Sequence, residues 1–424
     1  MLEINKIRLD KENVIELLKV KNFKYAEEKI NTLLILDEKK RQVQKELEDI
    51  KADLNIKSKV IGKFMKEGSK LEAENAKIEV ANLKDSSKEL EVQMVEKEKE
   101  IEDLLLSIPN LPHSSVPKGK TAEDNIIESN YGEIPKLYAG AVPHWDLCAR
   151  YDIVDFELGN KITGAGFPVY KGKGAKLQRA LINFFLDEAE KNGFSEVQPP
   201  LMVNEASALA TGQLPDKEGQ MYSIPLDGFY MIPTAEVPIT NIFRDVIVQE
   251  KDFPICKSAY SQCFRREAGS YGKDVRGLNR LHQFDKVEIV CIDHPDHSYK
   301  QLELMKQHVE GILKKLELPY RVLRLCGGDI SFTAALTFDF ETYSAAQERW
   351  LEVSSVSNFE TFQSNRLKLR FKNQEGKTQL AHTLNGSALA LPRIVASLLE
   401  NNQTPEGIKI PEVLVPYTGF RLIN

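Results

Sequence analysis

The stretch SQCFRREAGSYGKDVRGLNRLHQFDKVEIV, residues 261–290, joins two strand-like runs through a loop rich in glycine and arginine. A simple hairpin needs only about two turn residues, often Asn-Gly or Asp-Gly. The connection here runs from about Ala268 to Asn279, too long and too cationic for a purely structural turn. Loops of this length in a compact domain are usually functional or disordered. The stretch therefore predicts a strand pair that carries a functional loop.

The strand after the loop has one polar face. Side chains alternate between the two faces of a strand, so five residues share this face: Arg280, His282, Phe284, Lys286 and Glu288. A face packed against a core would be apolar, so charged groups here indicate a ligand-binding surface. An arginine can hold a carboxylate or phosphate through two parallel hydrogen bonds, and a phenylalanine offers a flat platform for a base. Together with Arg265 and Glu267 before the loop, these residues predict a nucleotide site.

Composition sets limits on the class of protein. The 424 residues predict two or three domains, with 42% apolar residues for sizeable cores. The net charge of -6 argues against nucleic-acid binding by the chain as a whole, so any such role needs a local basic surface. Five scattered cysteines without a C-x-x-C pair predict reduced core thiols in a cytosolic protein. Without a signal-like start or a run of about 20 apolar residues, we expect a soluble cytoplasmic protein with no membrane partner.

The segment from about residue 27 to 106 contains no proline and is rich in Lys, Glu, Leu and Ala. Two sets of residues recur there in alternating steps of four and three, which is the seam of a coiled coil. Gly62 and Gly68 are its only glycines. We expect an antiparallel helical hairpin with its tip near residues 65–70. The seam residues are Leu33, Leu36, Lys40, Val43, Leu47, Ile50, Leu54, Lys57, Ile61 and Phe64, then Ala73, Ala76, Val80, Leu83, Ser87, Leu90, Met94, Lys97, Ile101 and Leu104.

The distal part of this hairpin is basic, although the whole chain is acidic. Between residues 57 and 70 a single acid, Glu67, stands against Lys57, Lys59, Lys63, Lys66 and Lys70. Such lysines can neutralise phosphates of RNA with little sequence dependence. Two structural alternatives stay open: a dimerisation coil or spacer, and a merely solvated helix face.

A proline-rich segment, SIPNLPHSSVPKGK, follows the hairpin and predicts a domain boundary. We expect an N-terminal domain over residues 1–108 and a second domain over 109–424. In the second, short strand-like runs mix with a few amphipathic helices, without regular βαβ alternation, a G-x-G-x-x-G motif or a P-loop. The predicted fold class is α+β: a helical coiled-coil arm, then a mainly antiparallel sheet flanked by helices.

Several motifs carry a family resemblance. FRRE, the loop, and Arg280-x-x-x-Phe284-x-x-x-Glu288 resemble motif 2 of the class II aminoacyl-tRNA synthetases. TLNGSALALPRIVASLLE resembles motif 3, and the helix from residue 175 with Pro200 resembles motif 1, which builds the dimer interface in that class. The chain is more specifically similar to the seryl-tRNA synthetase family in TGQLP (211–215), IPTAEVPITN (232–241), EVSSVSN (352–358), HTLNGS (382–387) and IPEVLVPY (410–417).

The resemblance implies a set of site residues. Arg265 and Arg393 would be catalytic, with Arg265 on the amino-acid carboxylate and the α-phosphate, and Phe284 would stack on adenine. Serine would be bound by Thr234, Ala235, Glu236, Arg265, Glu288 and Ser387. ATP would be bound by Arg265, Arg266, Glu267, Phe284, Glu352, Val353, Ser354, Ser355 and Arg393. Mg²⁺ would be held through ATP by Glu352 and Ser355.

The same resemblance implies the reaction and the partners. The enzyme would activate L-serine with ATP to seryl-adenylate, release pyrophosphate, and transfer the seryl group to the terminal adenosine of tRNA(Ser). Charging of tRNA(Sec) stays open. We expect a homodimer whose arm, with the five distal lysines, contacts tRNA.

Three positions depart from the family pattern: Ser344, Leu351 and Val356. They put the detail around Glu352 in doubt but delete none of the implied contacts. Rival interpretations are an RNA-binding or scaffolding protein with a vestigial catalytic fold, a ligase that charges a carrier protein, and a class II enzyme for threonine or alanine. The complete set of motif residues argues against the first, the long arm against the second, and the ligand residues with no inserted editing domain against the third.

Overall fold

The computed structural model describes residues 1–216, 218–267 and 276–424. The chain divides into two compact units. The helical unit contains residues 2–19 and 23–109, and the sheet unit contains residue 1, residues 20–22 and residues 110–424. Residues 268–275, the first part of the predicted functional loop, lie outside the described residues.

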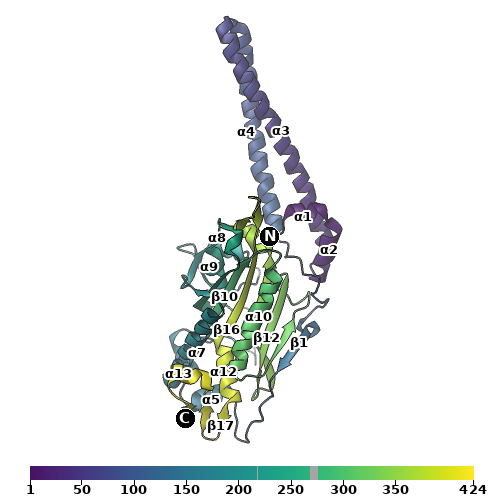
Figure 1. The fold of residues 1–424 in the computed structure, drawn as a ribbon. Coiled ribbons are helices and arrows are strands. Elements are labelled where there is room, and N and C mark those ends of the chain that lie inside the picture. The colour runs from purple at the N-terminus through teal and green to yellow at the C-terminus, as the bar shows by residue number, and fades with distance from the viewer. Residues whose placement is uncertain (217, 268–275) are drawn as a thin grey trace. The chain divides into compact units, whose positions relative to one another are not determined.

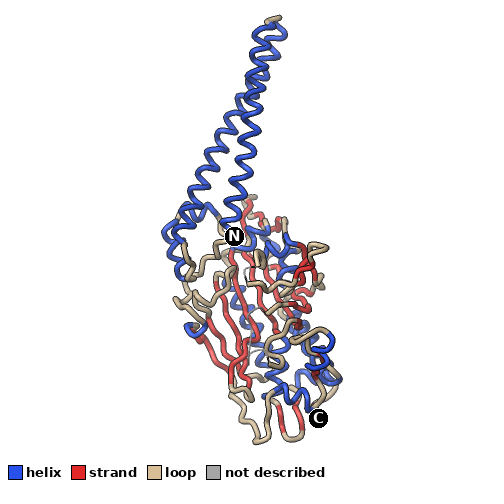
Figure 2. Tube along the Cα trace, turned by 180° about the vertical axis from the view of Figure 1, so that it is seen from behind, coloured by secondary structure: helices blue, strands red, loops and turns tan. Residues whose placement is uncertain are grey.

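The helical unit consists of α1 (Ile4–Leu9), α2 (Lys11–Val20), α3 (Ala26–Glu67) and α4 (Lys70–Leu106). The long helices α3 and α4 run side by side as an antiparallel pair (Figures 1 and 2). Every predicted seam residue is buried or half-buried, which confirms the heptad pattern. The hairpin turns where α3 ends at Gly68, whose φ of +77° suits glycine. Lys40–Glu98 and Lys51–Glu91, each 2.9 Å between charged atoms, are ion pairs between the helices.

The sheet unit is built on an eight-stranded sheet with the order β1-β11-β12-β13-β16-β10-β9-β4. Neighbouring strands are antiparallel except β4 and β9. This architecture confirms the predicted α+β fold class. The strands are β1 (Ile126–Tyr131), β11 (Tyr320–Arg324), β12 (Leu336–Ser344), β13 (Arg349–Glu360), β16 (His382–Ala390), β10 (Gln283–Asp293), β9 (Ile255–Phe264) and β4 (Ser195–Glu196).

The two faces of this sheet differ in chemistry. In β12, Phe338 and Phe340 belong to the main hydrophobic core, whereas Thr337, Asp339 and Glu341 face a cavity on the other side. Three helices supply the core on the apolar face: α7 (Gly172–Lys191), α10 (Ser298–Lys315) and α12 (Leu391–Asn401). In Figure 1, α10 lies in front of the strands. The polar face is thus left for ligands.

Smaller elements complete the sheet unit. The remaining helices are α5 (His144–Arg150), α6 (Phe156–Ile162), α8 (Glu205–Thr211), α9 (Glu236–Asn241), α11 (Thr361–Leu367) and α13 (Val415–Thr418), with short 3-10 turns at Ala122–Asp124, Glu250–Asp252 and Glu412–Leu414. The minor strands are β2 (Val154–Asp155), β3 (Val169–Tyr170), β5 (Met202–Asn204), β6 (Ser223–Ile224), β7 (Phe229–Met231), β8 (Ile247–Gln249), β14 (Arg370–Lys372), β15 (Thr378–Leu380), β17 (Gln403–Thr404), β18 (Gly407–Lys409) and β19 (Leu422–Ile423). Within the described residues, no helix is long and apolar enough to cross a membrane.

The prediction of five reduced thiols is wrong for Cys256 and Cys291, which form a disulfide. These residues face each other directly in the register of β9 and β10, with their Cα atoms 4.3 Å apart. Such close approach is typical of a non-hydrogen-bonded antiparallel pair. Spacing along the sequence gave no sign of this pairing because it depends on strand register. Cys148, Cys263 and Cys326 are free and buried, as predicted.

Candidate active site

A cavity of about 530 Å³ opens on the polar face of the large sheet. Its walls come from β10, β13 and β16, from the start of α12, and from the segments before α9 and around the loop between β9 and β10. Arg265 and Phe284, on either side of the same loop, and the distant Arg393 all line it. The cavity also contains most other predicted site residues: Thr234, Glu236, Glu267, Glu288, Glu352, Val353, Ser354, Ser355 and Ser387.

Three residues predicted for the serine or nucleotide site do not line the cavity. Ala235 is fully buried. Arg266 is exposed, and the structure gives its backbone N–H a hydrogen bond to the carbonyl of Gln220. Since strand periodicity turns consecutive side chains to opposite faces, Arg265 and Arg266 diverge at the end of β9. His282 also lies outside the lining, where it stacks on Phe167 with ring centroids 5.4 Å apart.

One end of the cavity is dominated by the aromatic ring of Phe284. The Arg265 guanidinium carbon lies 5.3 Å from the centroid of this ring, within reach of a cation–π interaction. Arg393 is held by hydrogen bonds from its Nε to the carbonyl of Asn279 (3.0 Å) and from its Nη1 to that of Glu352 (2.6 Å). Its placement follows from Pro392, which occupies the first turn of α12, where proline is tolerated.

The other end of the cavity holds buried charges. Lys286 and Glu288, with side chains only 6% and 2% exposed, form an ion pair, and Lys286 Nζ also donates to Thr234 Oγ1 at 2.7 Å. Burial and the neighbouring Glu288 raise the pKa of Glu236 to about 7, although it accepts a hydrogen bond from Gln363 at 2.7 Å. Burial likewise raises the pKa of Glu288, against the lowering effect of Lys286. The positive charges of Lys286 and Arg265 lower the pKa of both carboxyls. The buried carboxylates at this end suit a small ligand with an ammonium group.

The sequence placed Lys286 on the predicted ligand-binding face but gave it no specific role, and it did not identify Gln363 at all. Lys286 alternates with Phe284 and Glu288 on β10, so the strand pattern already contained its signal. Gln363 lies on α11 and reaches both Glu236 and Thr383 (2.7 Å each). Because those partners are separated by 127 and 20 residues, no local pattern could have revealed the contact.

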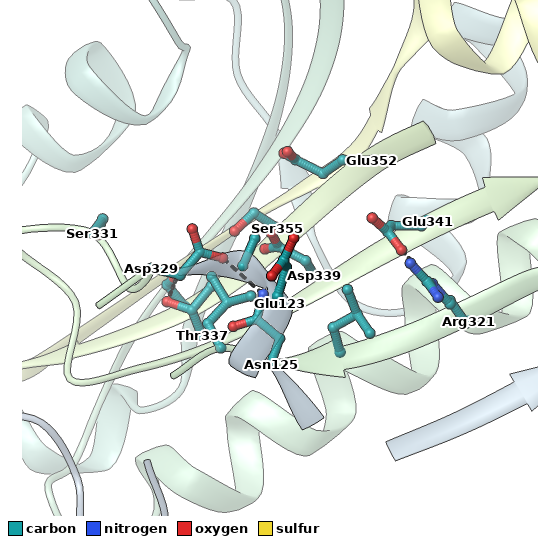
Figure 3. A pocket seen from close by; sticks show the side chains of 14 residues that line it. Glu123, Asn125, Arg321, Asp329, Ser331, Thr337, Asp339, Glu341, Glu352 and Ser355 are labelled. Atoms are coloured by element: carbon teal, nitrogen blue, oxygen red, sulfur yellow. Dashed lines mark hydrogen bonds and ion pairs between the residues drawn. The ribbon is translucent and has the colours of Figure 1, made fainter. Parts of the chain in front are cut away.

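A second cavity of about 560 Å³ adjoins the first and shares Glu352 and Ser355 with it. Figure 3 shows the carboxylates of Glu123, Asp329 and Asp339 around this space. Burial, together with the nearby Glu352, raises the pKa of Asp339 well above its ordinary value, while a hydrogen bond from Ser355 lowers it. Among the described residues, the buried Oδ1 of Asp339 has no hydrogen-bond partner. A cation at this junction would satisfy that oxygen and offset the repulsion between carboxylates.

The described residues contain no group of three or more His, Cys, Asp or Glu side chains arranged to hold a metal by themselves. Mg²⁺ is commonly bound by one or two carboxylates together with water and substrate phosphates, without an all-protein cage. Glu352, Ser355 and the unsatisfied Asp339 therefore fit a magnesium ion that arrives with a nucleotide.

Comparisons with known proteins cover the whole chain. The family model of the seryl-tRNA synthetase N-terminal domain matches residues 1–112, and the model of the class II tRNA synthetase core domain (G, H, P, S and T) matches residues 222–402. The serine–tRNA ligase of Salinibacter ruber is 51% identical over 100% of this chain and 99% of its own length. The chain belongs to the seryl-tRNA synthetase family. It is accordingly a class II aminoacyl-tRNA synthetase.

Other members of the seryl-tRNA synthetase family agree in sequence and structure. The Chlorobium phaeovibrioides enzyme is 46% identical over 100% of this chain and 99% of its own. The crystal structure of the Pyrococcus horikoshii synthetase complexed with ATP matches with a TM-score of 0.93 at 32% identity, covering 100% of this chain and 99% of that one. The Naegleria fowleri enzyme in complex with AMP matches with a TM-score of 0.85 at 27% identity, covering 97% and 95%.

Proposed function

We propose that the 530 Å³ cavity activates L-serine with ATP and that the product, seryl-adenylate, is then used to charge tRNA(Ser). The observation that carries this proposal is the convergence of Arg265, Phe284 and Arg393 on one cavity that ends in the buried Glu236, Lys286 and Glu288. A stacking platform with two guanidinium groups suits a nucleoside triphosphate, and the acidic end suits an amino-acid ammonium.

At the acidic end, serine is held by its ammonium and its hydroxyl group. Glu236 and Glu288 are the carboxylates available to the ammonium, and Thr234 and Ser387 are polar groups beside them. A site built to hydrogen-bond a hydroxyl leaves its own buried groups unpaired when alanine enters, so alanine is rejected strongly. The added methyl group of threonine is excluded by the buried wall.

At the other end, adenine stacks on Phe284. The guanidinium of Arg265 lies over the same ring, and we assign it to the α-phosphate of bound ATP. Arg393, already fixed by Asn279 and Glu352, then lies on the opposite face of adenine and reaches towards the γ-phosphate. Glu267 lies nearby and is ion-paired with Arg280 at 2.9 Å.

The first chemical step joins two anions. A serine carboxylate oxygen attacks the α-phosphorus of ATP, an O–P bond forms, and the bond to the leaving pyrophosphate breaks. The nucleophile is already ionised, so no general base is required. The arginines stabilise the charge that develops around the phosphorus, which is the largest contribution that a preorganised site can make. In the second step the terminal adenosine hydroxyl of tRNA accepts the seryl group and AMP leaves.

Glu352 and Ser355, with Asp339 beside them, are the residues that would hold Mg²⁺. When bound, the ion supplies positive charge that offsets the charge of the phosphates and of the leaving pyrophosphate. Arg393 lies 3.7 Å from the Glu352 carboxylate and keeps that side chain at the edge of the cavity.

We further propose that residues 1–108 form a tRNA-binding domain and residues 109–424 the catalytic domain. Lys59, Lys63, Lys66 and Lys70 are exposed near the hairpin tip and available to RNA phosphates. Lys57 is half-buried and ion-paired with Glu79, so it contributes less. The enzyme acts as a cytoplasmic homodimer, and tRNA(Sec) is a candidate second substrate.

The test is amino-acid-dependent exchange of pyrophosphate into ATP, measured across the twenty amino acids without tRNA. We expect strong exchange with serine, weak exchange with threonine and exchange near background with alanine. Exchange with another amino acid at the serine rate would refute the assignment of the acidic end.

A further inference from the structure

A buried histidine–glutamate pair lies beneath the loop that follows β9. His144, at the start of α5, and Glu400, near the end of α12, have side chains that are 0% exposed, with 2.7 Å between His144 Nδ1 and Glu400 Oε1. Neither side chain lines the ATP cavity. A carboxylate placed this deep is costly unless it is fully hydrogen-bonded.

Glu400 is supplied with five hydrogen bonds. Its donors are His144 Nδ1, His144 N (3.0 Å), Gln347 Nε2 (2.9 Å), Ala346 N (3.2 Å) and Ser344 Oγ. Burial alone would raise the pKa of Glu400, but the hydrogen bonds from His144 and Ser344 outweigh it and hold the pKa below its ordinary value. The carboxylate therefore stays ionised. Ser344, one of the three departures from the family pattern, is thereby assigned a role in this network.

The other ring nitrogen of His144 points to the loop. Nε2 accepts a hydrogen bond from the backbone N–H of Leu278 at 2.9 Å. Since Nδ1 donates to Glu400 and Nε2 accepts from Leu278, the imidazole is the neutral tautomer with its proton on Nδ1. The backbone packs against the ring: a Cβ added to Gly277, whose φ is +65°, would lie 2.3 Å from Nε2.

The same network reaches the ATP cavity through Asn279. Its Nδ2 donates to Gln347 Oε1 at 2.9 Å, and its carbonyl accepts from Arg393 Nε at 3.0 Å. Leu278 and Asn279 both line the cavity. Next to His144, Trp145 stacks under the guanidinium of Arg276 at 4.5 Å. Each of the four consecutive loop residues 276–279 is thus in contact with Trp145, His144 or Gln347.

We propose that His144 is a positioning residue for ATP: oriented by Glu400, it fixes the backbone at residues 277–279 and through it the guanidinium of Arg393. The inference rests on the proposed role of Arg393 as a nucleotide contact. His144 and Glu400 are given no part in binding serine. Among the described residues, no hydrogen bond joins the acidic end of the cavity to the network of His144 and Glu400.

The experiment uses the full-length protein and serine-dependent pyrophosphate exchange. In His144→Asn, the amide nitrogen can still donate to Glu400, but the shorter side chain does not reach Leu278. In His144→Gln, the longer amide can provide one donor and one acceptor. We expect His144→Asn to raise the KM for ATP by about fivefold to tenfold, the effect of one lost hydrogen bond. The KM for serine should change by less than about twofold, and His144→Gln should recover most of the loss.

The matched control is His308→Asn, which alters another buried histidine, on α10, that does not line the cavity. We expect it to leave both KM values near wild type. If His144→Asn fails to fold, Gln347→Met carries the test, because Gln347 is only half-buried and bridges Asn279 to Glu400. An unchanged KM for ATP, an equal rise in both KM values, or no recovery in His144→Gln would overturn the inference. If the wild-type protein shows no serine-dependent exchange, the proposed function itself fails.

Discussion

Two buried carboxyl groups and the Lys286 ammonium meet in the candidate active-site cavity. Burial raises the pKa of Glu236 and Glu288, so their ionised forms are costly at this depth. The serine ammonium would stabilise the ionised carboxylates when it binds. The buried carboxyl groups thus lower the stability of the protein, and the bound substrate offsets this loss. Such a trade-off between stability and function is common at functional sites.

Arg265 is the residue whose loss should be most damaging. We expect Arg265→Ala to lower serine-dependent pyrophosphate exchange by about 100-fold or more, because a preorganised positive group at the reacting phosphate is removed. Circular dichroism should show an intact fold, since the side chain is only half-buried. Exchange retained within about threefold of wild type would contradict its assigned role.

Glu236 should link stability to pH. Its folded pKa of about 7 lies above the ordinary value of 4.5, so the unfolded chain loses this proton first as the pH rises. The group's contribution to stability is therefore present at low pH and lost between about 4.5 and 7. Glu236→Gln removes the effect and can keep the hydrogen bond from Gln363.

We accordingly expect Glu236→Gln to be more stable relative to wild type at pH 8 than at pH 5 by about 2 kcal/mol in urea unfolding. The same variant should lose serine binding at both pH values. An equal stability difference at pH 5 and pH 8 would show that the carboxylate does not titrate in this window.

At the residue scale, the sequence was informative where a motif is local. Strand alternation placed Phe284, Lys286 and Glu288 on one face, and the structure keeps Phe284 and Glu288 in the predicted cavity. It could not show the contacts of Gln363 or His144, because their partners lie 127 and 256 residues away. Side chains at such separations are brought together only by the tertiary fold.

At the element scale, the hairpin of α3 and α4 was the most predictable part. Its heptad seam is periodic, so each buried position follows from the last, and Gly68 marks the turn. The strand pair β9 and β10 was equally visible, but the disulfide between them was not, because register is set by pairing across the sheet. The loop residues 268–275 carry a functional prediction that lies outside the described residues.

The hairpin of α3 and α4 should be required for tRNA charging but not for the first chemical step, the activation of serine with ATP. Deleting residues 45–93 and joining the ends with a short glycine-rich linker removes the distal arm but keeps the Lys40–Glu98 ion pair. We expect tRNA charging to be abolished while serine-dependent pyrophosphate exchange stays within about twofold of wild type. Loss of exchange in a protein that still folds would contradict this division of labour.

A companion variant tests the basic tip by charge alone. Replacing the exposed Lys59, Lys66 and Lys70 by alanine should weaken tRNA binding by about tenfold at low salt and flatten its salt dependence. The matched control changes Lys39, Lys45 and Lys99, which are exposed on the proximal arm. Equal effects of the two triple variants would mean that the tip has no special role.

At the scale of the whole molecule, the large sheet has an unprotected edge. All six residues of β1 are exposed, including Ile126, Ile127 and Tyr131 at 41%, 49% and 45%. Exposed apolar edge strands are liable to pair with another chain unless they are covered. In the proposed homodimer a second copy could bury this edge, in addition to the motif 1 helix α7 that the family resemblance assigns to the dimer interface.

Light scattering after gel filtration should give a molecular mass of twice the 48.1 kDa of one chain. We expect Ile127→Lys to shift the protein towards the monomer, because a charge in a buried interface is costly. As a control, Leu226→Lys alters an apolar residue that is 95% exposed on a loop and should leave the mass unchanged. A wild-type protein that runs as a monomer at micromolar concentration would refute the homodimer.

The most direct measurement is a crystal structure of the protein with a non-hydrolysable analogue of seryl-adenylate. The adenine ring should lie against Phe284, with Arg393 on its other face and Arg265 on the group that replaces the phosphate. The serine ammonium should contact Glu236 or Glu288. An analogue bound outside this cavity, or with its adenine away from Phe284, would contradict the account.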